Sequence, residues 1–310
     1  MKKHRIKTTE YKYVISPYEE PIAYVKSGDV LEIETEDAFA GKLDREDKNP
    51  ETVIPFFNPL TGPIYIDGAR TGDTLKVTIH GIEPLRDWGV SSIQGHFGAL
   101  GGTHTTRILN EPLKNQVFLY RLEGDEYVYN DRLRFSYEPF IGTIATAPAI
   151  EAVSALTPFA QGGNMDVPDV KPGNVIYLPI QKDGAYLYVG DCHARQGQGE
   201  ACGTALEIAA KVTLTAEVVR GKNIKWPRIE NDREMMCIGS ARPMEDAARI
   251  ACCEMIEWMQ EFGWTSEEAY QAITMDAGLY IGNMVDSAYS VVAKMKKETV
   301  ARGGGMWKNE

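Results

Sequence analysis

Hydrophobic and polar residues alternate along much of this 310-residue chain. Three segments share one plan: a basic residue, a small residue or proline, glycine, Asp or Asn, and then an alternating apolar run. They are KSGDVLEIET from Lys26, RTGDTLKVTI from Arg70 and KPGNVIYLPI from Lys171. Glycine followed by Asp or Asn is typical of a tight turn, and a period of two is that of a strand with one buried face. The pattern therefore predicts repeated turn–strand units.

Further strands follow the same period. KDGAYLYVGD from Lys182 fits the plan loosely, and residues 116–123 and 211–221 alternate as well. Residues 127–140 carry Asn-Asp between two alternating runs, which indicates a hairpin. Many short strands punctuated by Gly and Pro favour a β-sandwich or a barrel.

The last third of the chain has a different period. Residues 240–263 place apolar side chains on one helical stripe, with Ser240 as the expected cap. Thr265 and Glu268 have the spacing of a capping box. We predict a helical pair over 240–275 and a return strand over 288–300.

Composition narrows the class of protein. Hydrophobic residues make up 43% and charged residues 25%, which is typical of a globular protein. We find no clear linker, so we expect an N-terminal β region (1–150) and a C-terminal β region with the helices (151–310) to pack as one unit. The net charge of −11 argues against nucleic-acid or anionic-membrane partners.

Cysteine usage and apolar runs bear on the compartment. The five cysteines are odd in number and form no CxxC pair, which favours a reducing environment. The basic N-terminus has no apolar run behind it, and no stretch of about 20 apolar residues occurs. We therefore expect a cytoplasmic protein with no membrane partner.

Two polar residues continue an apolar strand face in AYLYVGDCH, residues 185–193. Alternation places positions 185, 187 and 189 on the same face as Asp191 and His193, with Cys192 on the other. A buried carboxylate needs a partner, which can be a metal, an arginine or a group of backbone amides. Asp191 and His193 are therefore candidate metal ligands. A Cys192 nucleophile is disfavoured, because neighbours on a strand point apart.

Asp37 continues the apolar face of VLEIETEDAF in the same way, and it is a third candidate ligand. The alternative is a structural turn residue. His96 and His104 flank a glycine-rich loop and are further candidate ligands, although single histidines are more often structural.

Two glycine-containing loops carry more polar groups. QGGNMD at 161–166 supplies Gly163, Asn164 and Asp166, and QGQGE ends in Glu200. Either can be an ordinary loop. If they converge with Asp191 and His193, the mixed oxygen and nitrogen donors suit Zn²⁺, Mn²⁺ or Fe²⁺, whereas oxygen ligands alone suit Ca²⁺. A spare carboxylate as base and Asn164 at an oxyanion would complete a metal-assisted hydrolase. The chain contains no GxSxG or P-loop motif, and no GxGxxG lies between a strand and a helix.

The segments GGNMD (162–166) and GDCHARQGQGE (190–200), the latter followed by GTALE, resemble the acetamidase/formamidase family. NPLTGPIYIDGARTGDTLKV (58–77) and IGTIATAP (141–148) extend the resemblance. It implies a jelly-roll-like β-sandwich with a small C-terminal helical part, assembled as a homo-oligomer (dimer or tetramer). It also implies hydrolysis of a short aliphatic amide, such as formamide or acetamide, to carboxylate and ammonia with zinc and sometimes a second, calcium site.

The resemblance also assigns roles to individual residues. It implies that Asp37, Asp191 and His193 bind metal, with His96 or His104 completing the set. Glu200 would be the base or a further ligand, and the remaining residues would contact or orient the substrate: Asp166, Asn164, Gln196 and Gly163. Gln198 stands where the family more often has Asp, and the chain is short for the family, which leaves the amide open. Two other readings remain: a non-catalytic, metal-stabilised β-sandwich binding protein, and a metal-dependent lyase or isomerase with a cupin-like fold.

Overall fold

The computed structural model describes residues 2–101 and 112–305, which form mainly strands with three short α-helices. The first sheet has nine strands in the order β1 (Lys3–Ile6), β4 (Val30–Thr35), β17 (Ala210–Val219), β6 (Thr74–Pro84), β14 (Val175–Pro179), β18 (Arg228–Glu230), β19 (Glu234–Ala241), β21 (Tyr289–Lys296) and β20 (Gly278–Ile281).

The second sheet has ten strands. Eight run in the order β10 (Arg134–Ser136), β9 (Glu126–Val128), β8 (Gln116–Glu123), β7 (Trp88–Ile93), β16 (Leu206–Ile208), β15 (Leu187–Arg195), β11 (Phe140–Ala145) and β13 (Gly162–Asn164). In addition, β5 (Leu60–Asp67) pairs with β15, and β3 (Ala23–Lys26) pairs with β5. A separate pair joins β2 (Val14–Ile15) to β12 (Val153–Ser154).

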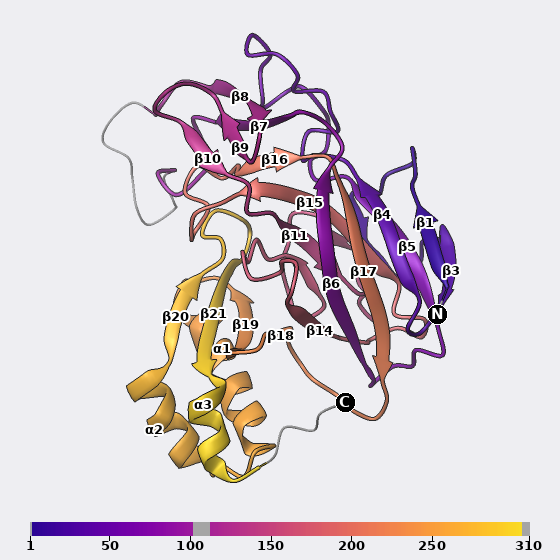
Figure 1. The fold of residues 1–310 in the computed structure, drawn as a ribbon, viewed down its shortest axis with the longest axis vertical. Coiled ribbons are helices and arrows are strands. Elements are labelled where there is room, and N and C mark those ends of the chain that lie inside the picture. Colours follow the sequence, from indigo (N-terminus) through magenta and orange to yellow (C-terminus); the bar gives the residue numbers. More distant parts are fainter. Residues whose placement is uncertain (1, 102–111, 306–310) are drawn as a thin grey trace.

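One apolar core joins the two sheets. Leu31 and Val77 of the first sheet belong to the same buried cluster as Ile141 and Leu187 of the second. Strands β6 and β17 lie beside β11 and β15 in Figure 1. The predicted fold class, a β-sandwich with a small C-terminal helical part, is confirmed.

The repeated turn motif builds the first sheet. Gly28, Gly72 and Gly173 adopt φ values of +86°, +91° and +89°, which glycine reaches without the steric cost of a Cβ. Each turn precedes one of the strands β4, β6 and β14. The predicted hairpin is also present, with β9 antiparallel to β10.

Strand β15 carries the candidate ligands through the middle of the second sheet. It pairs with β11, β16 and β5, and it is buried on both faces rather than on one. Cys192 faces the sandwich core, where the Thr35 hydroxyl donates to its sulfur at 3.5 Å. The predicted alternation is wrong beyond Val189: Asp191 adopts a φ of 54°, and Cys192 rather than Asp191 joins the core cluster of Leu187 and Val189. Asp191 and His193 therefore lie on the face away from that cluster, and both are buried.

The helices pack on the end of the first sheet formed by β19 and β21 (Figure 1). They are α1 (Met244–Gln260), α2 (Ser266–Asp276) and α3 (Lys297–Val300), followed by a 3₁₀ turn (Ala301–Gly303). The capping box of Thr265 and Glu268 is confirmed. The expectation for Ser240 is wrong: it lies in β19, paired with Ser290, and Pro243 is the N-cap of α1. Among the described helices, none is long and apolar enough to cross a bilayer.

Candidate metal and active site

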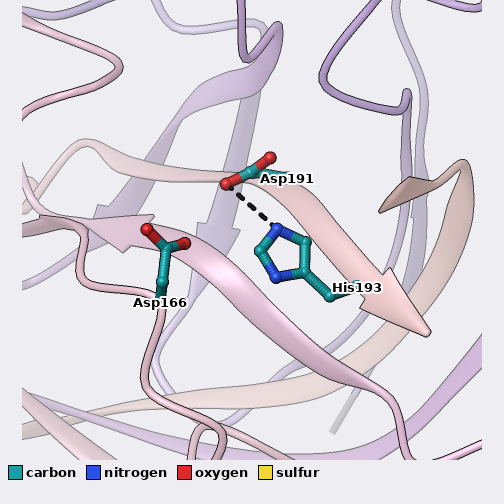
Figure 2. A group of neighbouring side chains, drawn as sticks. All are labelled: Asp166, Asp191 and His193. Atoms are coloured by element: carbon teal, nitrogen blue, oxygen red, sulfur yellow. Dashed lines mark ion pairs between the residues drawn. The ribbon is translucent and has the colours of Figure 1, made fainter. Parts of the chain in front are cut away.

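Buried polar side chains from two strands of the second sheet, from the segment after β13 and from one further loop converge on one point. Asp191 and His193 lie on β15, and Glu207 on β16 is the register partner of His193. Asp166 follows β13, and Asp286 comes from the loop between β20 and β21. Figure 2 shows Asp166 and Asp191 on two sides of the His193 ring.

Gln196 fixes the orientation and tautomer of His193. Its Nε2 donates to the backbone carbonyls of Asp166 at 2.9 Å and Gly282 at 3.0 Å. Because a carbonyl can only accept, the Gln196 Oε1 must be the atom that lies 2.9 Å from His193 Nδ1. Nδ1 therefore carries a hydrogen. The ring also packs edge-to-face against Phe140, with centroids 4.9 Å apart.

The other ring nitrogen of His193 faces carboxylates. Nε2 lies 3.2 Å from Glu207 Oε2 and 3.5 Å from Asp191 Oδ2, and these side chains are almost fully buried. A neutral imidazole with its hydrogen on Nδ1 would direct a lone pair at two anionic oxygens. A proton or a cation between these atoms removes that repulsion.

The donor geometry fits a metal ion. The ligand atoms of Asp166, Asp191 and His193 all lie within 4.8 Å of one another, and so do those of His193, Glu200 and Glu207. Three buried atoms of these residues have no hydrogen-bond partner, namely Asp166 Oδ1, His193 Nε2 and Glu207 Oε2. Buried unpaired oxygen and nitrogen donors that converge on one point are what a divalent cation requires.

An asparagine network holds the carboxylates in place. Asn164 Nδ2 donates to Asp166 Oδ2 at 2.9 Å and to Asp286 Oδ2 at 2.7 Å, while its Oδ1 accepts from Asn58 and Thr143. Asn283 Nδ2 also donates to Asp166 Oδ2, at 3.1 Å. These bonds use one oxygen of Asp166 and leave the other, Oδ1, facing the site.

Gly142 on β11 lets two carboxylates approach the sheet. A Cβ at this position would lie 2.7 Å from both Asp166 Oδ1 and Asp191 Oδ2. Any side chain at 142 would therefore occupy the space in which the two oxygens meet.

Charge repulsion and burial disturb the titration of these groups. Burial raises the pKa of Glu207 to about 7, against the lowering effect of His193. Burial likewise raises the pKa of Asp286 to about 7, and it raises the pKa values of Asp166 and Glu200 well above their ordinary values. Burial lowers the pKa of His193, but Glu207 and Asp191 outweigh it and raise that pKa well above its usual range. The group of acids therefore holds protons unless a cation replaces them.

Backbone strain is concentrated at this site. Asn58, Asp166, Asp191 and Glu200 are among the non-glycine residues with positive φ, between 48° and 56°. Such conformations persist where surrounding contacts hold them, and they are common at functional sites.

A cavity of about 350 Å³ leads to the carboxylates. Asp191, Glu200, Glu207 and Asp286 are among the residues that line it. Phe39 and Leu156 are among the apolar residues of the wall. The site is thus buried yet reachable by a small molecule.

Several residues predicted from the sequence lie elsewhere. Asp37 belongs to neither group of converging donors among the described residues; it accepts from the backbone N–H groups of Phe39 and Gly41 and pairs with Arg86 at 2.8 Å. This is the turn role that we considered as the alternative. Burial raises its pKa to about 6, which leaves it ionised at neutral pH.

Three further residues predicted from the sequence, His96, His104 and Gly163, are not among the converging donors of the described residues. His96 is exposed and lines the cavity, but it is not one of the converging donors. His104 lies outside the described residues. Gly163 does approach backbone closely, but the neighbour is Thr157, whose carbonyl oxygen would be 2.5 Å from a Cβ at 163.

The sequence analysis missed Glu207 and Asp286. A signal for Glu207 was present, because it is the only charged residue in the apolar run ALEIAA at 205–210. Asp286 lies in a polar loop and reaches the site through tertiary packing, so no local pattern marks it.

Comparisons with known proteins agree on one family. A sequence model of the acetamidase/formamidase family matches residues 14–156 and 149–295. A formamidase from Methylophilus methylotrophus is 25% identical over an alignment of 339 positions, which covers 86% of this chain and 83% of the formamidase.

Solved structures extend the likeness to the fold. An acetamidase from Yersinia enterocolitica is 39% identical with a TM-score of 0.93, over 96% of this chain and 93% of that one. An acetamidase from Bacillus halodurans is 32% identical with a TM-score of 0.90, over 97% and 100%. The cupin-like alternative predicted several histidines around one metal, whereas one histidine belongs to the donor groups found among the described residues.

Proposed function

Because the chain belongs to the acetamidase/formamidase family and is a hydrolase of amide C–N bonds, we propose a metal-dependent cleavage of primary carboxamides. The reaction consumes one water per amide and yields a carboxylate and ammonium. The C–N bond breaks, a C–O bond forms, and the protons of water pass to the nitrogen.

One observation carries the metal dependence. Gln196 places the hydrogen of His193 on Nδ1, so Nε2 turns a lone pair toward Glu207 and Asp191. A metal-ligating histidine in proteins almost always donates its other N–H to an oxygen in this way. The hydrogen bond from His193 Nδ1 to Gln196 Oε1 therefore leaves Nε2 as the ring nitrogen that would face the ion.

We assign Asp166, Asp191, His193 and Glu207 as the residues that would hold the ion. One imidazole with carboxylate oxygens suits Zn²⁺, which we take as the first candidate, and Ca²⁺ remains the candidate for a second site. When bound, a divalent cation supplies Lewis-acid polarisation and lowers the pKa of water. Asp37, His96 and His104 are not part of this assignment.

Glu200 is the residue best placed for proton transfer. It lines the cavity, is 8% exposed, adopts a strained φ of 48°, and its carboxylate lies within 4.8 Å of ligand atoms of His193 and Glu207. Burial raises its pKa well above the ordinary value, which makes its carboxylate a stronger base. We propose that its carboxylate accepts a proton from water and returns it to the amide nitrogen as that nitrogen leaves.

Asn164 and Gln196 act on protein groups in this proposal. Both amides are engaged with carboxylates, carbonyls or His193, so each positions the ligands. The acceptor-rich end of the cavity is left to the N–H groups of the substrate.

Ammonia release tests the proposal directly. We expect the purified protein to release ammonia from formamide or acetamide, to lose this activity on chelation, and to regain it with Zn²⁺. Glu200→Gln should retain bound metal and lose about 10²–10⁴-fold in kcat. Activity that survives complete removal of metal would refute the metal dependence, and full activity of Glu200→Gln would remove Glu200 from its role.

A further inference from the structure

The cavity is larger than the smallest amides need. At the liquid density of water, about 30 Å³ per non-hydrogen atom, its volume of about 350 Å³ has room for roughly twelve such atoms. Acetamide has four non-hydrogen atoms. A substrate that fills this cavity therefore carries several more atoms than acetamide does.

The additional space is apolar. The apolar side chains that line the cavity are Ala38, Phe39, Phe57, Phe97 and Leu156. Phe39 is 1% exposed and packs edge-to-face against Phe57, with ring centroids 5.6 Å apart. Aromatic rings held by such contacts form a surface that favours an apolar group over water.

The charges of the cavity restrict the substrate further. Among the described residues that line it, Glu51, Asp191, Glu200, Glu207 and Asp286 are acidic and none is Lys or Arg. Ionised carboxylates accept hydrogen bonds and do not donate them. An anionic substrate would thus meet repulsion with no cationic side chain to offset it, even with one divalent ion bound.

We propose that the substrate is an uncharged primary amide whose acyl group is apolar and larger than acetyl, of about four to eight carbons. Its NH₂ group lies among the carboxylates, where both hydrogens find acceptors. Its acyl chain or ring lies against Phe39, Phe57 and Leu156. This assignment rests on the proposed amidase function and adds the substrate class to it.

A substrate series tests the assignment on the metal-loaded protein. Each buried methylene favours binding about fourfold, so kcat/KM should rise roughly fifteenfold from acetamide to butyramide. Benzamide or phenylacetamide should be at least as good as butyramide. Succinamate, in which a carboxylate replaces the methyl group of butyramide, should be at least about 100-fold poorer than butyramide.

A substitution that fills part of the cavity tests whether the preference for larger acyl groups arises there. Leu156→Trp should lower the butyramide-to-acetamide ratio of kcat/KM about tenfold. Leu279→Trp makes the same change on β20 at a side chain that is 55% exposed and outside the cavity lining, and it should leave the ratio unchanged. Equal ratios for wild type and Leu156→Trp would overturn the placement of the acyl group.

Two outcomes separate this inference from the proposed function. If acetamide is turned over but kcat/KM is no higher for butyramide or phenylacetamide, the proposed amidase function stands and the apolar substrate class is overturned. Calorimetry with phenylacetamide gives an independent readout. Absence of turnover for every amide would refute the proposed function. In that case the binding data alone decide the substrate class: phenylacetamide that binds wild type but not Leu156→Trp would support the apolar class, and any other result would overturn it.

Discussion

Asp37 and Asp191 are both almost fully buried, at 1% and 2% exposure, but their surroundings are opposite in charge. The carboxylate of Asp37 accepts from two backbone N–H groups and from the guanidinium of Arg86. That of Asp191 receives a hydroxyl contact from Thr143 at 3.3 Å and faces His193. Other acids, including Glu207, surround it.

The difference teaches what each region still needs. A buried carboxylate with an arginine and backbone donors is neutralised within the protein, and it contributes to folding without a ligand. A buried group of carboxylates with one imidazole must take up protons or a cation. Burial alone therefore does not identify a functional acid, whereas burial without a cationic partner does.

The largest expected effect separates the two regions by mutation. His193→Ala should lose bound metal and more than about 100-fold in activity while the protein remains folded. Asp37→Asn should instead cost about 1–3 kcal/mol of unfolding free energy, because Arg86 loses a charged partner, and should keep its metal. Metal content by mass spectrometry, ammonia release and thermal unfolding of both variants measure these outcomes.

The contrast fails if the two variants behave alike. Loss of metal in folded Asp37→Asn would show that the Arg86 pair does not separate Asp37 from the site. Full metal content in His193→Ala would show that the ring does not hold the ion.

The sequence predicted the parts of this contrast that depend on local pattern. The β-sandwich followed from alternation and repeated turns. Asp191 and His193 were found as polar residues at the end of an apolar strand, although they lie on the face opposite the one that alternation predicted. Asp37 and Asp191 look alike at that level, because each continues an apolar face. Arg86, which distinguishes them, lies 49 positions from Asp37 and meets it through tertiary packing. Asp286 reached the site in the same non-local way, so local pattern could not reveal it.

The next effect is a pH dependence that a bound metal should remove only in the region without arginine, since burial also raises the pKa of Asp37, to about 6. Burial raises the folded-state pKa values of Glu207 and Asp286 to about 7, above their ordinary values of 4.5 and 3.8. The folded, metal-free protein then binds more protons than the unfolded chain between about pH 4 and 7. Its unfolding free energy should fall as the pH rises through this window, by roughly 3 kcal/mol for Glu207 alone.

Metal should remove this fall, because it holds the same carboxylates ionised. Urea unfolding of metal-stripped and metal-loaded protein from pH 4.5 to 7.5 measures the difference, which should widen with pH. In the metal-free protein, Glu207→Gln should reduce the fall of the unfolding free energy with pH by the part that Glu207 contributes. Parallel profiles with and without metal would show that these acids are not coupled to an ion.

The smallest predicted effect concerns the side chain that orients His193. Gln196→Leu keeps the volume but removes the acceptor of the Nδ1 hydrogen and the two bonds to backbone carbonyls. The ring is then free to turn, and metal affinity should fall about 10–100-fold, while activity at saturating metal falls less. Gln198→Leu is the matched control, because Gln198 is exposed two residues away. Competition with a chromophoric chelator measures both affinities. Equal affinities would mean that packing against Phe140, at 4.9 Å between ring centroids, suffices to hold the imidazole.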